Sequence, residues 1–192
     1  MTYSLAFAAL WTVWMASWGI AAFWASKPAK RPAATEEPFY WLLTVAGAAL
    51  MFFNFRRDGS LTLVWSTPDA VEWALFAVAA AGLAFTWWAR IHLGTLWSGS
   101  VTRKADHHIV DSGPYGIVRH PIYTGILAAI YATVLLRPGV FGIAGAALLT
   151  VAFVIKLRLE ERFLMQELGA DAYEGYRRRV PMLVPFWPVP RG

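Results

Sequence analysis

Histidine, tyrosine, arginine and glutamate side chains gather in three short segments of the C-terminal half of the chain. The first segment starts at His107 and reads HHIVDSGPY, with a Gly-Pro turn after a short apolar pair. Exposed backbone groups beside such a turn could hold the edges of a ligand. An ordinary loop at a membrane surface would show the same spacing, so this segment alone leaves both interpretations open.

The second segment reads RHPIYTG and starts at Arg119. Pro121 suits the first turn of a helix, where its missing N–H costs nothing. His120 then lies at the helix N-terminus, which favours anionic groups, and Tyr123 lies one turn further on nearly the same face. Gly125 permits close approach of a helix or a ligand. An interfacial belt of Arg and Tyr explains Arg119 and Tyr123 well, but explains His120 and Gly125 less well.

The third segment reads KLRLEERFL and starts at Lys156. Lys156 and Glu160 are spaced i,i+4, so they could simply pair on one helix face, a contact worth a few tenths of a kcal/mol. The functional alternative is that Glu160 binds hydroxyl or ammonium groups of a ligand. A basic residue one turn earlier would then hold an anionic group of the substrate.

Several other chemistries find no support in the sequence. The chain has no cysteine, which excludes disulfides, thiolate metal sites and a cysteine nucleophile. Its four histidines form no HExxH or His-x-His pattern, so we predict no metal site. The net charge of +5 is interpreted as a membrane-topology signal, and no nucleic-acid partner is expected.

The composition indicates that a lipid bilayer is the solvent of most of the chain. Hydrophobic residues make up 58% and charged residues only 15% of the 192 residues, and mean hydropathy is +0.46. Apolar stretches long enough to cross a membrane, or nearly so, occur five times. The five predicted spans are Ser4–Ala25, Phe39–Phe55, Val71–Ala89, Ile122–Leu136 and Val140–Ile155. The first is too long for the apolar core of a signal peptide, so we expect it to be retained.

The basic residues predict the orientation of these spans. Of the 17 Lys and Arg residues, three (Arg56, Arg57 and Arg137) fall in the outer segments if the N-terminus is outside. The inner segments hold the other 14, namely Lys27, Lys30, Arg31, Arg90, Arg103, Lys104, Arg119, Lys156, Arg158, Arg162, Arg177, Arg178, Arg179 and Arg191. Because cytoplasmic loops are enriched in basic residues, we expect the C-terminus to be cytoplasmic.

The predicted fold class is an all-α integral membrane protein of about five transmembrane helices. Residues 1–89 would form the first three spans. Residues 90–192 would form a catalytic region consisting of a cytoplasmic loop, a helical hairpin, and a C-terminal helix and tail. All three polar segments then lie on the cytoplasmic side, so a cofactor pocket is expected there.

In their order along the chain, these segments resemble the isoprenylcysteine carboxyl methyltransferase family of membrane enzymes. The resemblance covers about residues 90–187 and rests on the combination rather than on any one piece. Its elements are Leu93-Gly94, Trp97-Ser98, His107 to Val110, Gly113-Pro114-Tyr115, Arg119-His120-Pro121-Ile122-Tyr123, Gly125, Glu160-Glu161, Leu164, Gly169, Tyr173, Tyr176 and Val180-Pro181.

The resemblance implies S-adenosylmethionine as cofactor, bound without a Rossmann domain. It implies a set of cofactor-binding residues, namely His107, Ile109, Val110, Tyr115, Arg119, His120, Pro121, Tyr123, Glu160 and Glu161. It also places Lys156, Arg158 and Glu160 at the reacting centre. The family pattern has an Arg for the substrate carboxylate where this chain has Lys156, and often a Gln where it has Ser100.

The acceptor that the resemblance implies is a prenylcysteine carboxylate or a similar amphiphilic acid. A carboxylate is already ionised at pH 7 and needs no base, whereas a thiol or a phospholipid amine would need one. Those two acceptors remain alternatives. A nicotinamide-dependent membrane lipid reductase is a second alternative, and a small transporter or scaffold is a third. The near absence of charge within the spans, with polar residues on one side, favours a one-sided catalytic site over a conduit.

Overall fold

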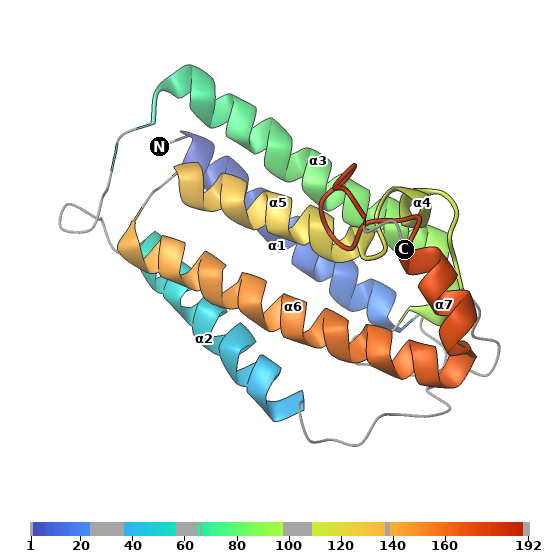
Figure 1. Ribbon diagram of the computed structural model, residues 1–192. Helices are drawn as coiled ribbons and strands as arrows, with labels where there is room; N and C mark the ends of the chain where they lie inside the picture. Colours follow the sequence, from blue (N-terminus) through green and yellow to red (C-terminus); the bar gives the residue numbers. More distant parts are fainter. Residues whose placement is uncertain are drawn as a thin grey trace.

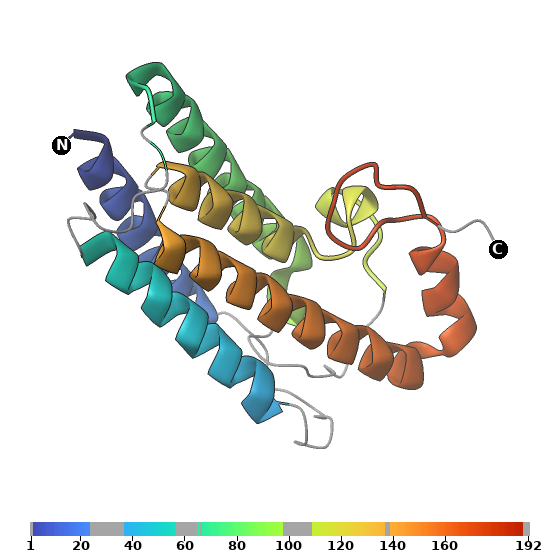
Figure 2. The same cartoon turned by 60° about the vertical axis from the view of Figure 1, so that its left-hand side comes forward.

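The computed structural model describes residues 2–23, 37–56, 65, 67–97, 109–136 and 139–189, and the regular elements of these ranges are helical. Five long helices lie side by side and alternate in direction along the chain (Figures 1 and 2). They are α1 (Thr2–Ala22), α2 (Glu37–Arg56), α3 (Asp69–Leu93), α5 (Pro121–Leu136) and α6 (Val140–Leu168).

Each predicted apolar segment forms one of these helices, which confirms the all-α membrane fold class. Within the described ranges, three helical stretches are long and apolar enough to cross a membrane: Ser4–Ala22, Asp69–Leu96 and Val140–Glu167. The helix α5 is apolar but shorter. Large apolar side chains such as Leu5, Val45 and Val151 face outward, as expected for a surface in contact with lipid. The count of five spans and the orientation of the termini stay predictions.

Glycine pairs join the helices into two closely packed pairs. In the pair α3 and α5, a Cβ atom added to Gly82 would lie 2.7 Å from the carbonyl oxygen of Gly125. In the pair α2 and α6, a Cβ atom on Gly145 would lie 2.7 Å from the carbonyl oxygen of Gly47. Only residues without a side chain allow backbones this close, which is how small residues mediate helix association in lipid.

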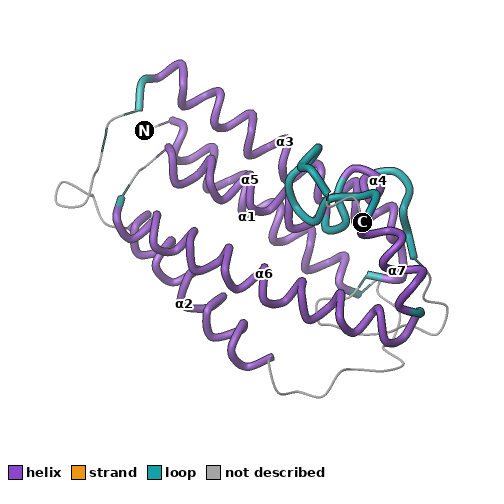
Figure 3. Tube along the Cα trace, viewed as in Figure 1, coloured by secondary structure: helices purple, strands orange, loops and turns teal. Residues whose placement is uncertain are grey.

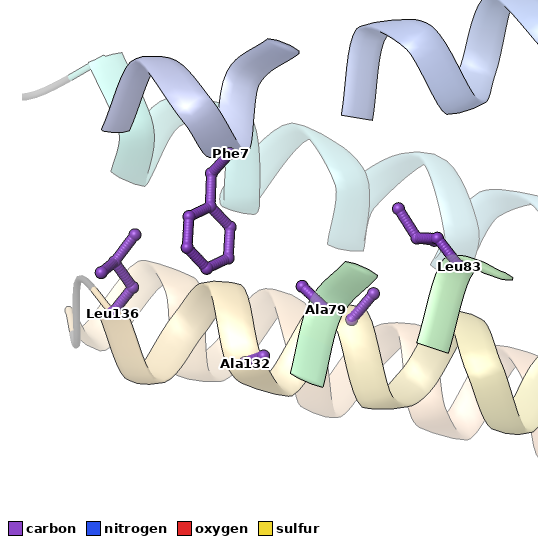
Figure 4. Close-up of a cluster of buried hydrophobic side chains, with 6 residues drawn as sticks. Phe7, Ala79, Leu83, Ala132 and Leu136 are labelled. Atoms are coloured by element: carbon purple, nitrogen blue, oxygen red, sulfur yellow. The ribbon is translucent and has the colours of Figure 1, made fainter. Parts of the chain in front are cut away.

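A hydrophobic cluster connects α1 to the α3–α5 pair. Phe7 is completely buried and packs among Ala79 and Leu83 of α3 and Ala132 and Leu136 of α5 (Figure 4). The Phe7 ring also packs edge to face against the Phe76 ring, with 5.5 Å between the ring centroids. The N-terminal helix is therefore part of the packed core.

The short elements gather at one end of the bundle, together with the C-terminal ends of α3 and α6 and the N-terminal end of α5 (Figures 1 and 3). They are the 3-10 turn η1 (Gly94–Leu96), α4 (Pro114–Ile117), α7 (Ala170–Arg177) and the tail that follows α7. The polar segments that the topology assigns to one side thus lie together.

We expect Gly125→Ala to destabilise the fold, because its Cβ would push against the Gly82 backbone; overpacking of this kind typically costs about 1–3 kcal/mol. Gly19→Ala is the matched control, since nothing lies within 4 Å of the added atom and alanine favours a helix. Thermal unfolding in detergent should show a lower midpoint for Gly125→Ala and an equal or higher midpoint for Gly19→Ala. Equal midpoints for both variants would contradict the glycine-mediated packing.

Candidate active site

The chain reaches the N-terminus of α5 through a tight turn that requires glycine. Gly113 has a φ of 56°, and a Cβ atom there would lie 2.8 Å from the ring of His92 on α3. The same histidine ring is 3.0 Å from the Ser112 hydroxyl. Pro114 then starts α4, and Pro121 is the first residue of α5, as the sequence predicts. The turn thus fixes where the segment between α3 and α5 crosses the end of the bundle.

A buried carboxylate on α6 binds two side chains that precede α5. The Arg119 guanidinium donates to Glu161 through Nε at 2.7 Å and through Nη2 at 3.3 Å. His120 Nε2 lies 3.0 Å from the Glu161 oxygen that Arg119 Nε also contacts. Arg177 of α7 adds a longer ion contact of 3.5 Å to the other oxygen. Because the Glu161 side chain is only 7% exposed, this charge is held by partners rather than by water.

The tail that follows α7 docks beside the same residues through its backbone. The amides of Arg119 and His120 donate to the carbonyls of Pro181 and Met182, at 2.8 and 3.1 Å. Arg119 Nη1 also donates to the carbonyls of Arg177 and Val180. These contacts consume most of the donors of Arg119, so its guanidinium has a structural role here.

The Thr124 hydroxyl extends this docking by donating to the carbonyl of Leu183 at 2.6 Å. The tail therefore follows the start of α5 over three consecutive carbonyls, from Pro181 to Leu183.

Three tyrosines form the wall beside the tail. Burial raises the pKa of the Tyr115 phenol far above its ordinary value, and the Glu160 carboxylate raises it further. Burial likewise raises the pKa of Tyr173 and of Tyr176. All three phenols are therefore protonated at neutral pH. The Tyr176 hydroxyl donates to the Tyr115 carbonyl at 2.7 Å, which ties α7 to α4.

A second polar group lies on α6 one helical turn before Glu160. The Lys156 ammonium, on a side chain that is buried, donates to the Tyr123 hydroxyl of α5 at 2.6 Å. The Tyr123 ring packs edge to face against the Phe153 ring, with 5.0 Å between the ring centroids. Glu160 itself is half-buried and interacts electrostatically with both Lys156 and Tyr115. Glu160 thus lies between the lysine–tyrosine pair and the tyrosine wall.

The structure brings most of the predicted site residues to one end of the bundle. Ile109 packs against the tyrosines of α7, and Val110 packs beside Tyr115. The predicted cofactor residue His107 lies outside the described residues. Arg158 is exposed, whereas Lys156 is buried, so the two candidate substrate-binding bases lie on different faces of α6.

Two features of the site were not predicted from the sequence. One is the docking of tail carbonyls onto the start of α5, for which backbone atoms leave no pattern of residue types. The other is Tyr40 of α2, whose ring centroid lies 5.9 Å from the Lys156 ammonium. Tyr40 belongs to no motif. Within the described ranges, no three His, Asp or Glu side chains are grouped so that they could hold a metal ion.

Comparison with known proteins identifies relatives of this chain. The model of the isoprenylcysteine carboxyl methyltransferase (ICMT) family matches residues 73–166. The chain is 36% identical to "Methanethiol S-methyltransferase 2" of Bradyrhizobium diazoefficiens, an alignment that covers 80% of this chain and 61% of that protein. It is 34% identical to "Protein-S-isoprenylcysteine O-methyltransferase B" of Arabidopsis thaliana, over 57% of this chain and 51% of the relative. The chain thus spans less than two thirds of the length of these relatives.

A solved structure shares the fold. The eukaryotic intramembrane Ras methyltransferase ICMT superposes with a TM-score of 0.52 and 19% sequence identity, covering 82% of this chain and 55% of the other. This likeness concerns the arrangement of the helices, and it agrees with the membrane fold expected from the sequence.

We expect Glu161→Gln to loosen the tail and to lower the thermal midpoint in detergent, because Arg119 loses the charge that compensates its burial. Breaking a buried ion pair costs about 3–5 kcal/mol. Glu174→Gln is the control, since its ion pair with Arg177 is 40% exposed and such pairs contribute about 0–1 kcal/mol. Limited proteolysis should cut the tail faster in Glu161→Gln alone. Identical cleavage and melting of both variants and wild type would contradict the role of Glu161.

Proposed function

We propose that this chain, whose residues 73–166 match the isoprenylcysteine carboxyl methyltransferase family, transfers a methyl group from S-adenosylmethionine to an acceptor that reaches it from the membrane. The active site would be the end of the bundle that holds α4, α7 and the tail. In the predicted topology this end faces the cytoplasm.

The observation that carries the proposal is the difference in surroundings between the Glu160 and Glu161 carboxylates. Glu161 is occupied by Arg119 and His120, whereas Glu160 is half-buried and interacts electrostatically with Lys156 and Tyr115. A half-buried carboxylate in this position is suited to hydroxyl and ammonium groups of a ligand, and S-adenosylmethionine has both.

The chemistry of the surrounding residues fits the rest of the cofactor. Tyr115 and Tyr123 offer aromatic faces, which attract a cationic sulfonium group. Glu160 is the residue through which we expect the cofactor's polar groups to be held, and Ile109 and Val110 supply apolar contact. When bound, the cofactor provides an activated methyl group. The protein's contribution is to position the acceptor in line with it and to exclude water.

Among the possible acceptors, we propose a thiol rather than a carboxylate. The family pattern has an Arg at the position where this chain has Lys156. The planar guanidinium of Arg matches the two oxygens of a carboxylate, whereas the ammonium of Lys is a compact point charge suited to a single anionic atom. A relative that aligns with 80% of this chain is described as a methanethiol S-methyltransferase, which points to the same acceptor class. A prenylcysteine carboxylate, as in the name of the plant relative, is the second candidate.

We expect Glu160→Gln to weaken S-adenosylmethionine binding at least tenfold, a change of about 1.4 kcal/mol or more, because the neutral amide loses the charge that attracts the cofactor's ammonium. Isothermal calorimetry on detergent-purified protein measures this directly. Glu174→Gln should bind like wild type, because Glu174 lies on α7 with its side chain 40% exposed and pairs with Arg177. Absence of binding by folded wild-type protein, in detergent and in lipid nanodiscs, would refute the methyltransferase proposal.

We expect Lys156→Met to reduce kcat/KM for a small alkanethiol at least a hundredfold, because the buried positive charge beside the acceptor is lost. The loss should concern the thiol acceptor alone. The affinity of the variant for S-adenosylmethionine should stay within a factor of three of the wild-type value. Arg158→Met is the matched control, since Arg158 lies two residues away on the same helix but is exposed. Equal loss in both variants would show that the charge acts at long range rather than at the acceptor.

A further inference from the structure

Tyr40 on α2 has a hydroxyl that is buried without a partner. The residue is 1% exposed, and no described residue accepts the proton of its hydroxyl; the indole of Trp41 approaches the phenolic oxygen only as a weak donor. The buried tyrosines of the tyrosine wall differ, since Tyr176 donates to the Tyr115 carbonyl. A buried hydroxyl that lacks a partner is costly, so its presence calls for an explanation.

The environment of Tyr40 identifies a group of charged and phenolic side chains from three helices. The Lys156 ammonium on α6 lies 5.9 Å from the centroid of the Tyr40 ring and 5.3 Å from that of Tyr123 on α5. The Tyr40 phenol interacts electrostatically with both Lys156 and Tyr123. Phe153 closes one side of this group through its edge-to-face contact with Tyr123. We refer to Tyr40, Tyr123 and Lys156 as the phenol–lysine cluster.

The hydrogen-bond roles in the phenol–lysine cluster leave it rich in donors. An ammonium group can only donate, so the Tyr123 oxygen accepts from Lys156 and the Tyr123 proton remains available to another acceptor. The Tyr40 proton is likewise unused. Two carboxylates are also near: Glu160 interacts with Lys156, and Glu37 interacts with Tyr40.

Two phenolic protons and a lysine ammonium are the kind of donors that one electron-rich atom requires. Because the Tyr40 hydroxyl is sealed from water, a ligand that reaches it must be small and apolar apart from that atom. Glu160 lies one helical turn after Lys156 and interacts with Tyr115, and the proposed cofactor would bring its positive charge to this carboxylate. An anionic atom between the cluster and that charge would interact favourably with both.

We propose that Tyr40 completes an acceptor-binding subsite with Lys156 and Tyr123, and that this subsite binds a small alkanethiol as its thiolate. The inference rests on the proposed methyl transfer and extends it to the acceptor. It also assigns a functional residue to α2, a helix that precedes the segment matched by the family model.

The proposed step balances in atoms and charge. The thiol releases its proton to the solvent when it binds, because the cluster stabilises the thiolate. A lone pair of the thiolate sulfur forms the new carbon–sulfur bond as the bond between the methyl carbon and the donor sulfonium breaks. The electron pair of the broken bond remains on the donor sulfur. The methylated acceptor and the demethylated donor are therefore both neutral thioethers.

Tyr40→Phe tests the subsite, because it removes only the hydroxyl. We expect binding of 1-propanethiol to protein saturated with S-adenosylhomocysteine to weaken at least fivefold, and KM for this thiol to rise by a similar factor. S-adenosylmethionine affinity should not change. Thermal stability should be equal or higher, since the removed group has no partner to lose. Tyr131→Phe is the control: the Tyr131 hydroxyl bonds Thr150 between α5 and α6 and is exposed, so thiol binding should match wild type.

Proton release supplies a readout that does not depend on turnover. The heat of 1-propanethiol binding, measured at pH 7 in two buffers of different ionisation enthalpy, should show release of about one proton. The cysteine thiol has a pKa of about 8.5 and a simple alkanethiol is a weaker acid, so the free ligand is protonated at pH 7. Unchanged thiol affinity in Tyr40→Phe, or thiol binding without proton release, would overturn the inference while leaving methyl transfer intact. Failure of wild type to bind S-adenosylmethionine would instead overturn both.

Discussion

The buried carboxylate of Glu161 is the contact on which the rest of the site depends. It compensates the charge of Arg119 at the start of α5 and positions His120, and Arg119 in turn holds the tail through the carbonyls of Arg177 and Val180. A charge removed from water is stable only with such partners, so α5, α6, α7 and the tail must be assembled together. The neighbouring Glu160 takes no part in this group of contacts, and under the proposed function it binds the cofactor.

The glycine contacts set the distance across which that ligand would be held. Lys156 lies on α6, which packs closely on α2 through Gly145, and its partner Tyr123 lies on α5, which packs closely on α3 through Gly125. The lysine–tyrosine bond therefore joins the two helix pairs near the polar end. In lipid, where apolar side chains provide little driving force for association, a buried polar contact of this kind helps to specify how the pairs meet.

Sequence reasoning predicted the five helices because a bilayer requires continuous apolar segments with internally satisfied backbones. It also predicted the polar segments that meet at one end. It could not distinguish the roles of Glu160 and Glu161, since adjacent residues differ by about 100° around a helix and the rotation of α6 is set by its neighbours. The role of Tyr40 was not predicted for a related reason. Its position beside Lys156 arises from the packing of α2 on α6, which no local motif encodes.

The docking of the tail has a consequence for the order of events during biosynthesis. The carbonyls of Pro181, Met182 and Leu183, which bind the start of α5, leave the ribosome after every helix of the bundle has been made. Until then, Arg119 and Glu161 have each other, His120 and the contacts with Arg177 of α7. The helices can therefore pack together before the tail is in place, and the binding of the tail carbonyls completes the hydrogen bonding at the start of α5.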